Sequence, residues 1–121
     1  MTYQIIYRVN VRGRSKKRVF QHIERRFPGV DFAELDANEY PKFPGTFMAQ
    51  FRETRSAESH AVLVYGVMKT ARTVASSLWS FVGPIEISGT LEFSCVLNNE
   101  DADDVICWAS IETISNGTKT P

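Results

Sequence analysis

Hydrophobic and polar residues alternate with a period of two in three parts of this chain. The alternation is clearest over residues 2–12, where one face carries Tyr3, Ile5, Tyr7, Val9 and Val11. Residues 46–54 and 85–97 follow the same pattern, and a further apolar run follows the acidic segment 98–104. A period of two predicts a strand with one buried face. We therefore expect strands at 2–12, 46–54, 85–97 and about 105–114.

A helix is predicted between the first two strands. Ser15 can cap its start, and apolar residues then recur at helical spacing until Phe27-Pro28-Gly29 ends it. Residues 28–45 contain three prolines and two glycines, and we expect a loop there with a short extended piece at 30–35.

The segment 59–82 can be interpreted in two ways. Valines and Gly66 crowd its first half and disfavour one long helix. We therefore expect a buried strand at 60–68 and an amphipathic helix at 70–81. The alternative is one long helix with a smaller sheet.

These elements predict an α+β fold, namely a ferredoxin-like split β-α-β unit (β-α-β-β-α-β) with an additional C-terminal antiparallel strand. The first strand would lie beside the strand at 85–97, with Arg8 and Arg12 across from Glu86 and Glu92. If the last hairpin is symmetric about its loop, Cys95 lies opposite Cys107. Directly opposed residues are within disulfide-bridging distance, but we expect reduced thiols in a reducing compartment.

Length and composition indicate one domain at 1–114 with a flexible tail at 115–121. The first residues lack a basic segment followed by an apolar run, and no stretch reaches the ~18 apolar residues of a membrane span. We therefore expect a cytoplasmic protein with no membrane contact.

Charge is unevenly distributed although the formal net charge is zero. The basic residues gather near the N-terminus and the acidic ones near the C-terminus. Two interpretations remain open: two binding patches of opposite sign, or two segments that lie together and neutralise each other.

The motifs of common chemistries are missing from the sequence. His22 and His60 lie on separate elements and have no metal-ligand spacing. No nucleophile elbow, phosphate-binding loop or dinucleotide glycine pattern occurs. We therefore expect no metal, no cofactor and no enzymatic activity.

A non-enzymatic protein-binding module is the function that the sequence favours. The hypothesis is an immunity or inhibitor protein that neutralises a basic partner, such as a nuclease toxin. Its partner-binding residues would be an acidic loop that steers association and an apolar group with an aromatic anchor: Val96, Glu100, Asp101, Asp103, Asp104, Ile106 and Trp108. In the opposing interpretation, the loop with Tyr40 and Phe43 simply covers Trp108.

Two alternatives remain. The first is a small ligand-binding protein or enzyme that forms a homodimer through the sheet, with a pocket near Tyr3, Tyr7, His60 and Tyr65. The second, which the zero net charge disfavours, is nucleic-acid binding by the basic first helix. Its candidate residues are Arg14, Lys16, Lys17, Arg18, Arg25 and Arg26.

Overall fold

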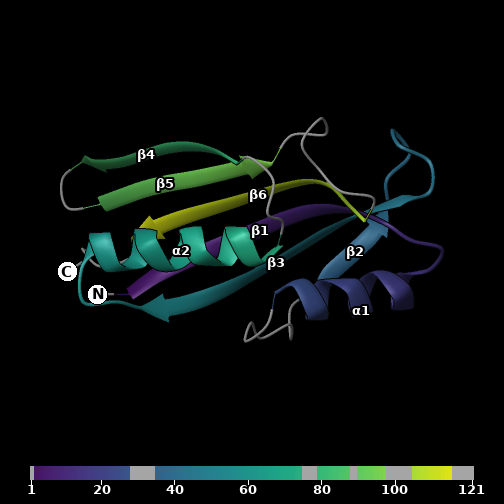
Figure 1. Ribbon diagram of the computed structural model, residues 1–121, viewed down its shortest axis with the longest axis horizontal. Coiled ribbons are helices and arrows are strands. Elements are labelled where there is room, and N and C mark those ends of the chain that lie inside the picture. Colours follow the sequence, from purple (N-terminus) through teal and green to yellow (C-terminus); the bar gives the residue numbers. More distant parts are fainter. Residues whose placement is uncertain (1, 28–34, 75–78, 88–89, 98–104, 116–121) are drawn as a thin grey trace.

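The computed structural model describes residues 2–27, 35–74, 79–87, 90–97 and 105–115 (Figure 1). Its elements follow one another as β1 (Thr2–Arg12), α1 (Lys16–Arg26), β2 (Asp36–Glu39), β3 (Thr46–Ser56), α2 (His60–Val74), β4 (Ser80–Ile87), β5 (Thr90–Leu97) and β6 (Ile106–Ser115). The strands form one antiparallel sheet in the order β2-β3-β1-β6-β5-β4. The predicted α+β class is confirmed.

The ferredoxin-like strand order is not confirmed. In that order, the first strand after the second helix lies beside β1. Here β4 lies at the far edge of the sheet, and the hairpins β4-β5 and β5-β6 bring β6 beside β1 instead. Arg8 therefore lies beside Glu112 of β6, not across from Glu86 or Glu92.

The predicted strand at 60–68 is wrong, because residues 60–74 form the helix α2. Ser59 accepts a hydrogen bond from the Val62 amide at 3.3 Å and caps this helix. Its buried residues are Leu63, Val67, Ala71 and Val74. Valine costs an α-helix only a few tenths of a kcal/mol, and burial of this apolar stripe outweighs that cost.

The predicted helix at 70–81 is confirmed over 70–74 and wrong from Trp79, since Ser80–Ile87 is the strand β4; residues 75–78 lie outside the described residues. The predicted single strand 85–97 is in fact two strands, β4 and β5, which pair with each other. The dipeptide Ser88-Gly89 between them is a common turn signal in sequences, and it falls outside the described residues.

The register of the last hairpin differs from the symmetric prediction. Cys95 pairs with Ile111 and Leu97 with Ala109, four positions away from the expected pairing. A shift by an even number of residues leaves every side chain on the same face, so alternation alone cannot fix it. Cys95 and Cys107 are consequently not opposed, and both are free thiols.

The two helices lie on the same side of the sheet, α2 in front of its middle strands and α1 near β2 (Figure 1). The core fills the space between these helices and the sheet. At its centre, the rings of Tyr7 and Phe51 stack at 4.7 Å between centroids, and Phe27 packs edge-on against both. Phe27 is the residue that ends α1, so this aromatic contact fixes the end of the helix against the sheet.

The C-terminal end of α2 is bound by a residue of α1. Arg26 Nη1 donates a hydrogen bond of 2.6 Å to the carbonyl of Val74, the last residue of α2. Carbonyls at a helix C-terminus lack intrahelical partners and carry partial negative charge. The guanidinium of Arg26 therefore satisfies one of these carbonyls and opposes the dipole of α2.

We predict opposite effects from alanine at two glycines. At Gly13 a Cβ would lie 2.8 Å from Val19 Cγ2 of the fully buried Val19, so Gly13→Ala should cost about 1–3 kcal/mol of unfolding free energy through overpacking. At Gly66, inside α2, a Cβ would meet only the end of Arg55 at 3.4 Å. Gly66→Ala should gain about 0.5–1 kcal/mol from helix propensity. Urea denaturation measures both, and equal shifts of the same sign would contradict the packing described.

We also predict that Arg26→Gln lowers the unfolding free energy by about 1–2 kcal/mol, since it removes a charged hydrogen bond at a helix end. Arg25→Gln is the matched control, because Arg25 is exposed and hydrogen-bonds only to His22 among the contacts that the structure describes for it. Its effect should stay within about 0.5 kcal/mol. Equal losses in the two variants, measured by the same denaturation, would remove the capping role.

Candidate functional site

The face of the sheet opposite the helices is the candidate site, and we refer to it as the open face. Over the described residues, no helix lies on it. Alternation along the strands and the observed register place six apolar side chains there, all at least partly accessible. They are Ile6, Met48, Val82, Val96, Trp108 and Ile114.

Charged side chains on the open face are segregated by strand. Arg8, Arg12 and Arg52 lie on β1 and β3, whereas Glu92 and Glu112 lie on β5 and β6. Asp36 lies at the β2 edge beyond them. The two halves meet at an ion pair of 2.8 Å between Arg8 and Glu112, whose side chains are 40% and 43% exposed. An ion pair this exposed contributes little to stability, but it keeps both charges accessible to a partner.

One end of this face is closed. Asn10 is buried and donates hydrogen bonds to Thr46 Oγ1 at 2.9 Å and to the Phe47 carbonyl at 3.3 Å. Thr46 in turn donates to the Phe43 carbonyl at 2.7 Å. This chain of hydrogen bonds holds the β2-β3 turn against β1, so the accessible part of the face extends from Trp108 towards Ile114.

The predicted partner-binding residues divide into three groups. Val96 and Trp108 lie on the open face and are partly buried, as expected. Ile106 does not, because it is fully buried in the core. The register between β1 and β6 shifts at Asn10 and Val11, which places Ile106 opposite Val11. A β-bulge of this kind moves one residue to the other face. The acidic residues Glu100, Asp101, Asp103 and Asp104 lie outside the described residues.

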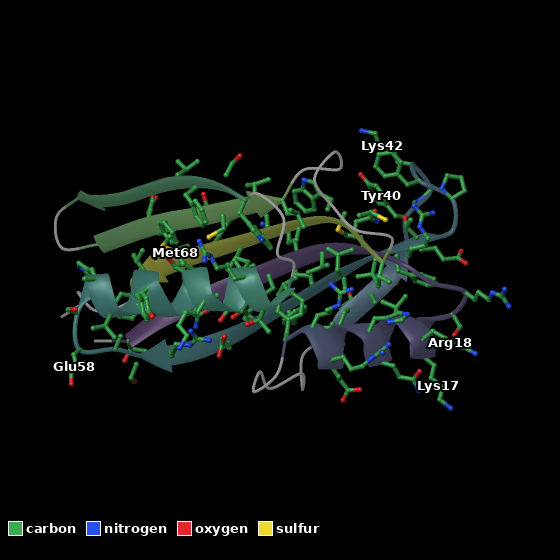
Figure 2. All side chains as sticks on the ribbon, in the orientation of Figure 1. Lys17, Arg18, Tyr40, Lys42, Glu58 and Met68 are labelled. Atoms are coloured by element: carbon green, nitrogen blue, oxygen red, sulfur yellow. The ribbon has the colours of Figure 1, made fainter. Side chains whose placement is uncertain are left out.

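The basic residues of the nucleic-acid hypothesis do not form one continuous stripe. Lys16, Lys17 and Arg18 are exposed at the start of α1, and Figure 2 shows Lys17 and Arg18 at the same end of the molecule as Tyr40 and Lys42. Arg26, in contrast, donates a hydrogen bond to the carbonyl of Val74 at the end of α2. Desolvation and the nearby arginines lower the pKa of His22 below its usual value, which favours the neutral imidazole.

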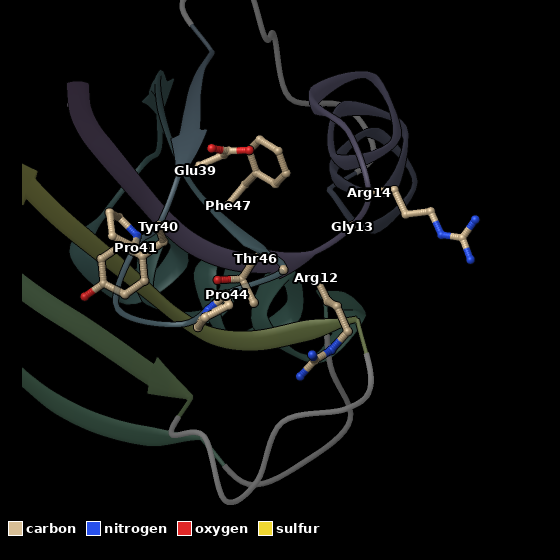
Figure 3. Close-up of a pocket in the computed structure, with 10 residues that line it drawn as sticks. Arg12, Gly13, Arg14, Glu39, Tyr40, Pro41, Pro44, Thr46 and Phe47 are labelled. Carbon is tan, nitrogen blue, oxygen red and sulfur yellow. The ribbon is translucent and has the colours of Figure 1, made fainter.

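A groove of about 810 Å³ adjoins this basic end. The turn after β1 and the β2-β3 turn line it, with Arg12, Arg14, Tyr40 and Phe47 among its residues (Figure 3). Figure 3 shows the side chains of Arg12 and Arg14 extending in different directions, and Arg12 Nη2 donates a hydrogen bond of 3.6 Å to Cys107 Sγ. The two guanidinium groups therefore do not converge on one point where they could hold an anion together.

A cluster of polar side chains lies on the covered face, between the sheet and α2. The Tyr3 hydroxyl and His60 Nδ1 form a hydrogen bond of 2.8 Å. The Tyr7 hydroxyl donates to Glu53, whose carboxylate also pairs with Arg55 at 2.7 Å. Burial and the Glu53 carboxylate raise the pKa of Tyr7 well above its usual value, so Tyr7 stays a neutral donor at every physiological pH.

The structure thus brings together three of the four residues expected around a pocket, Tyr3, Tyr7 and His60. Tyr65 is not with them, since it is 66% exposed on the outer side of α2. Glu53 and Arg55 were not predicted as site residues, although they continue the alternation of β3 on its buried face. Charged residues at buried positions of a strand were the available signal.

Metal ligands do not gather anywhere in the described part of the chain: no group of three His, Cys, Asp or Glu side chains could hold an ion there. None of its helices is long and apolar enough to span a membrane. In comparisons with known proteins, no family model matches the chain, and no curated protein or solved structure matches it significantly.

We predict that the two thiols differ strongly in reactivity. Burial raises the pKa of the Cys95 thiol to about 12, so about one molecule in ten thousand carries the reactive thiolate at pH 8. Cys107 is only half-buried. Iodoacetamide at pH 8, followed by mass spectrometry, should add one label to the native protein and two in urea. Loss of the native label in Cys107→Ser would assign it, and two labels on the native protein would contradict the burial of Cys95.

Proposed function

We propose that this protein is a non-enzymatic protein-binding module that uses the open face of its sheet. The observation that supports the proposal is the one-sided sheet: both helices cover one face, and the other presents apolar side chains around the Arg8–Glu112 ion pair. A contiguous accessible surface that mixes apolar and charged groups is typical of a protein interface.

The size of the face is consistent with this role. Six strands spaced about 4.8 Å apart span roughly 25 Å, and eight residues along a strand span about 26 Å. The face therefore offers about 600–700 Å² to a partner. Standard protein interfaces bury about 600–1,000 Å² on each side, so a partner would have to cover nearly the whole face.

The partner that the sequence suggested, a basic protein such as a nuclease toxin, is one form of this proposal. Glu92 and Glu112 support it, because they lie on the two strands that the acidic segment 98–104 connects. Trp108 would be the aromatic anchor. Ile106 is no longer part of the proposed interface, because it lies in the core. We further propose that the protein works in the cytoplasm, where two unpaired cysteines remain reduced.

A small ligand-binding protein or enzyme is the second candidate. The specific observation that favours it is the paired polar cluster of Tyr3 with His60 and of Tyr7 with Glu53 and Arg55. Among the described residues, these side chains hydrogen-bond to one another and line none of the three grooves around Tyr40, Ser94 and Gln50. A structural role therefore explains the presence of this polar cluster as well as a catalytic role does.

A pair of double variants tests the proposal. Val82→Arg with Ile114→Arg places charge on the open face, where these side chains are 56% and 40% exposed. Val62→Arg with Tyr65→Arg is the matched control, because these residues are 51% and 66% exposed on α2. Both double variants should unfold at urea concentrations near that of the native protein, since all four positions are accessible.

The measurement is crosslinking of the tagged protein in its source cells, followed by mass spectrometry of the crosslinked residues. We expect crosslinks from another polypeptide to map to the open face and to fall at least tenfold in the open-face variant but not in the α2 variant. If crosslinking were lost only in the α2 variant, the binding surface would be α2 and the proposal would be refuted. Equal crosslinking of the native protein and both double variants would also refute it.

A further inference from the structure

We propose that the partner on the open face is a second copy of this chain, with two sheets packed face to face about a twofold axis parallel to the strands. This inference rests on the proposed protein-binding role of that face. It is carried by the positions of the arginines and glutamates of the open face, which are self-complementary under one of the two in-plane twofold rotations of a sheet.

The midline of the sheet runs between β1 and β6, with three strands on each side. The arginines of the open face lie on β1 and β3, on one side of this line. Glu92 and Glu112 lie on β5 and β6, on the other side. A twofold axis along the midline exchanges the two halves, and so places the basic strands of one copy over the acidic strands of the other. A twofold perpendicular to the strands would instead oppose like charges.

The register shows which residues would meet. Arg52 pairs with Ile6, Ile6 with Glu112, and Glu112 with Ser94, so all four lie at one level across the sheet. The axis along the midline places Arg52 of one copy over Ser94 of the other. Glu92 is two residues from Ser94 on the same strand and the same face. Arg52 and the second copy's Glu92 would therefore be neighbours, and symmetry repeats the pair.

The centre of the face fits the same axis. Arg8 and Glu112 flank the midline and are already paired at 2.8 Å with both side chains accessible. In the dimer, these four groups would form one alternating ring of charge, with Ile6, Val96 and Ile114 around it. Aligned packing of two sheets, about 10 Å apart, brings long side chains such as arginine and glutamate within reach of each other.

Edge-to-edge pairing of two copies is disfavoured by the form of the edge strands β4 and β2. The pairing of β4 with β5 shifts register between Val82 and Ile85, and Gly83 has a φ of 96°. The segment also contains Pro84, which has no backbone donor. An interrupted edge of this kind does not accept another strand readily, and β2, at the other edge of the sheet, is only four residues long.

Charge reversal with exchange of variants tests this dimer. Sedimentation velocity of the native protein between 1 and 100 μM should show a monomer–dimer equilibrium that weakens at high salt. Arg52→Glu alone opposes two carboxylates at each symmetric contact, and Glu92→Arg alone opposes two guanidinium groups. Each variant should raise the dimer dissociation constant at least tenfold. Arg25→Glu on α1 is the control and should leave it unchanged.

The two variants mixed together give the decisive result. In a heterodimer of Arg52→Glu with Glu92→Arg, both contacts again join opposite charges, so dimers should reappear in the mixture although neither protein dimerises well alone. A native protein that remains monomeric at 100 μM would overturn the inference. If its open-face crosslinks to a different protein persist, the proposed function stands and only the second copy is excluded. Dimers that the single variants do not weaken would place the contact elsewhere and also overturn it.

Discussion

The pairing of β1 on both of its sides is the constraint on which the rest of this structure depends. All eleven residues of β1 pair with β3, and its other edge pairs with β6, the last of the described strands. Its inward residues Tyr3, Ile5, Tyr7, Val9 and Val11 are essentially fully buried. The sheet is therefore incomplete until the C-terminal strand is in place, and the hairpins β4-β5 and β5-β6 carry that strand back to the centre. Such non-local pairing is typical of slowly folding topologies.

Among the described residues, no helix lies on one face of this sheet. Two helices of 11 and 15 residues are about 16 and 22 Å long, and they meet near the middle of one face, where Arg26 reaches the end of α2. Together they are long enough to cover one face only. The other face carries charged side chains among its apolar ones. Their distribution is uneven, with the arginines on one half of the sheet and the glutamates on the other. The open face is thus a consequence of the fold, while its charge pattern is a property of this sequence.

The elements whose sequence pattern is local could be predicted correctly. The predictions were wrong where contacts between distant segments determine the secondary structure or the strand register. β1, α1 and β3 were predictable because alternation, the Ser15 cap and the Pro28-Gly29 stop all act within a few residues. α2 was missed because its valines favour a strand locally, and only packing of Leu63 and Val67 on the sheet makes the helix favourable. The register of β6 was missed because shifts by even numbers preserve the alternation.

The candidate site shows the same division. Val96 and Trp108 could be placed on the outer face from alternation alone, whereas Ile106 could not, because a bulge between Asn10 and Val11 reverses its side. Arg52 was not predicted as a site residue, because an exposed arginine on a strand indicates no function until its neighbours in the sheet are known. Its importance arises from the strand order, which places it level with Glu112 and across the midline from Glu92. A complementary charge pattern is a property of the assembled sheet, so no single segment of the chain contains it.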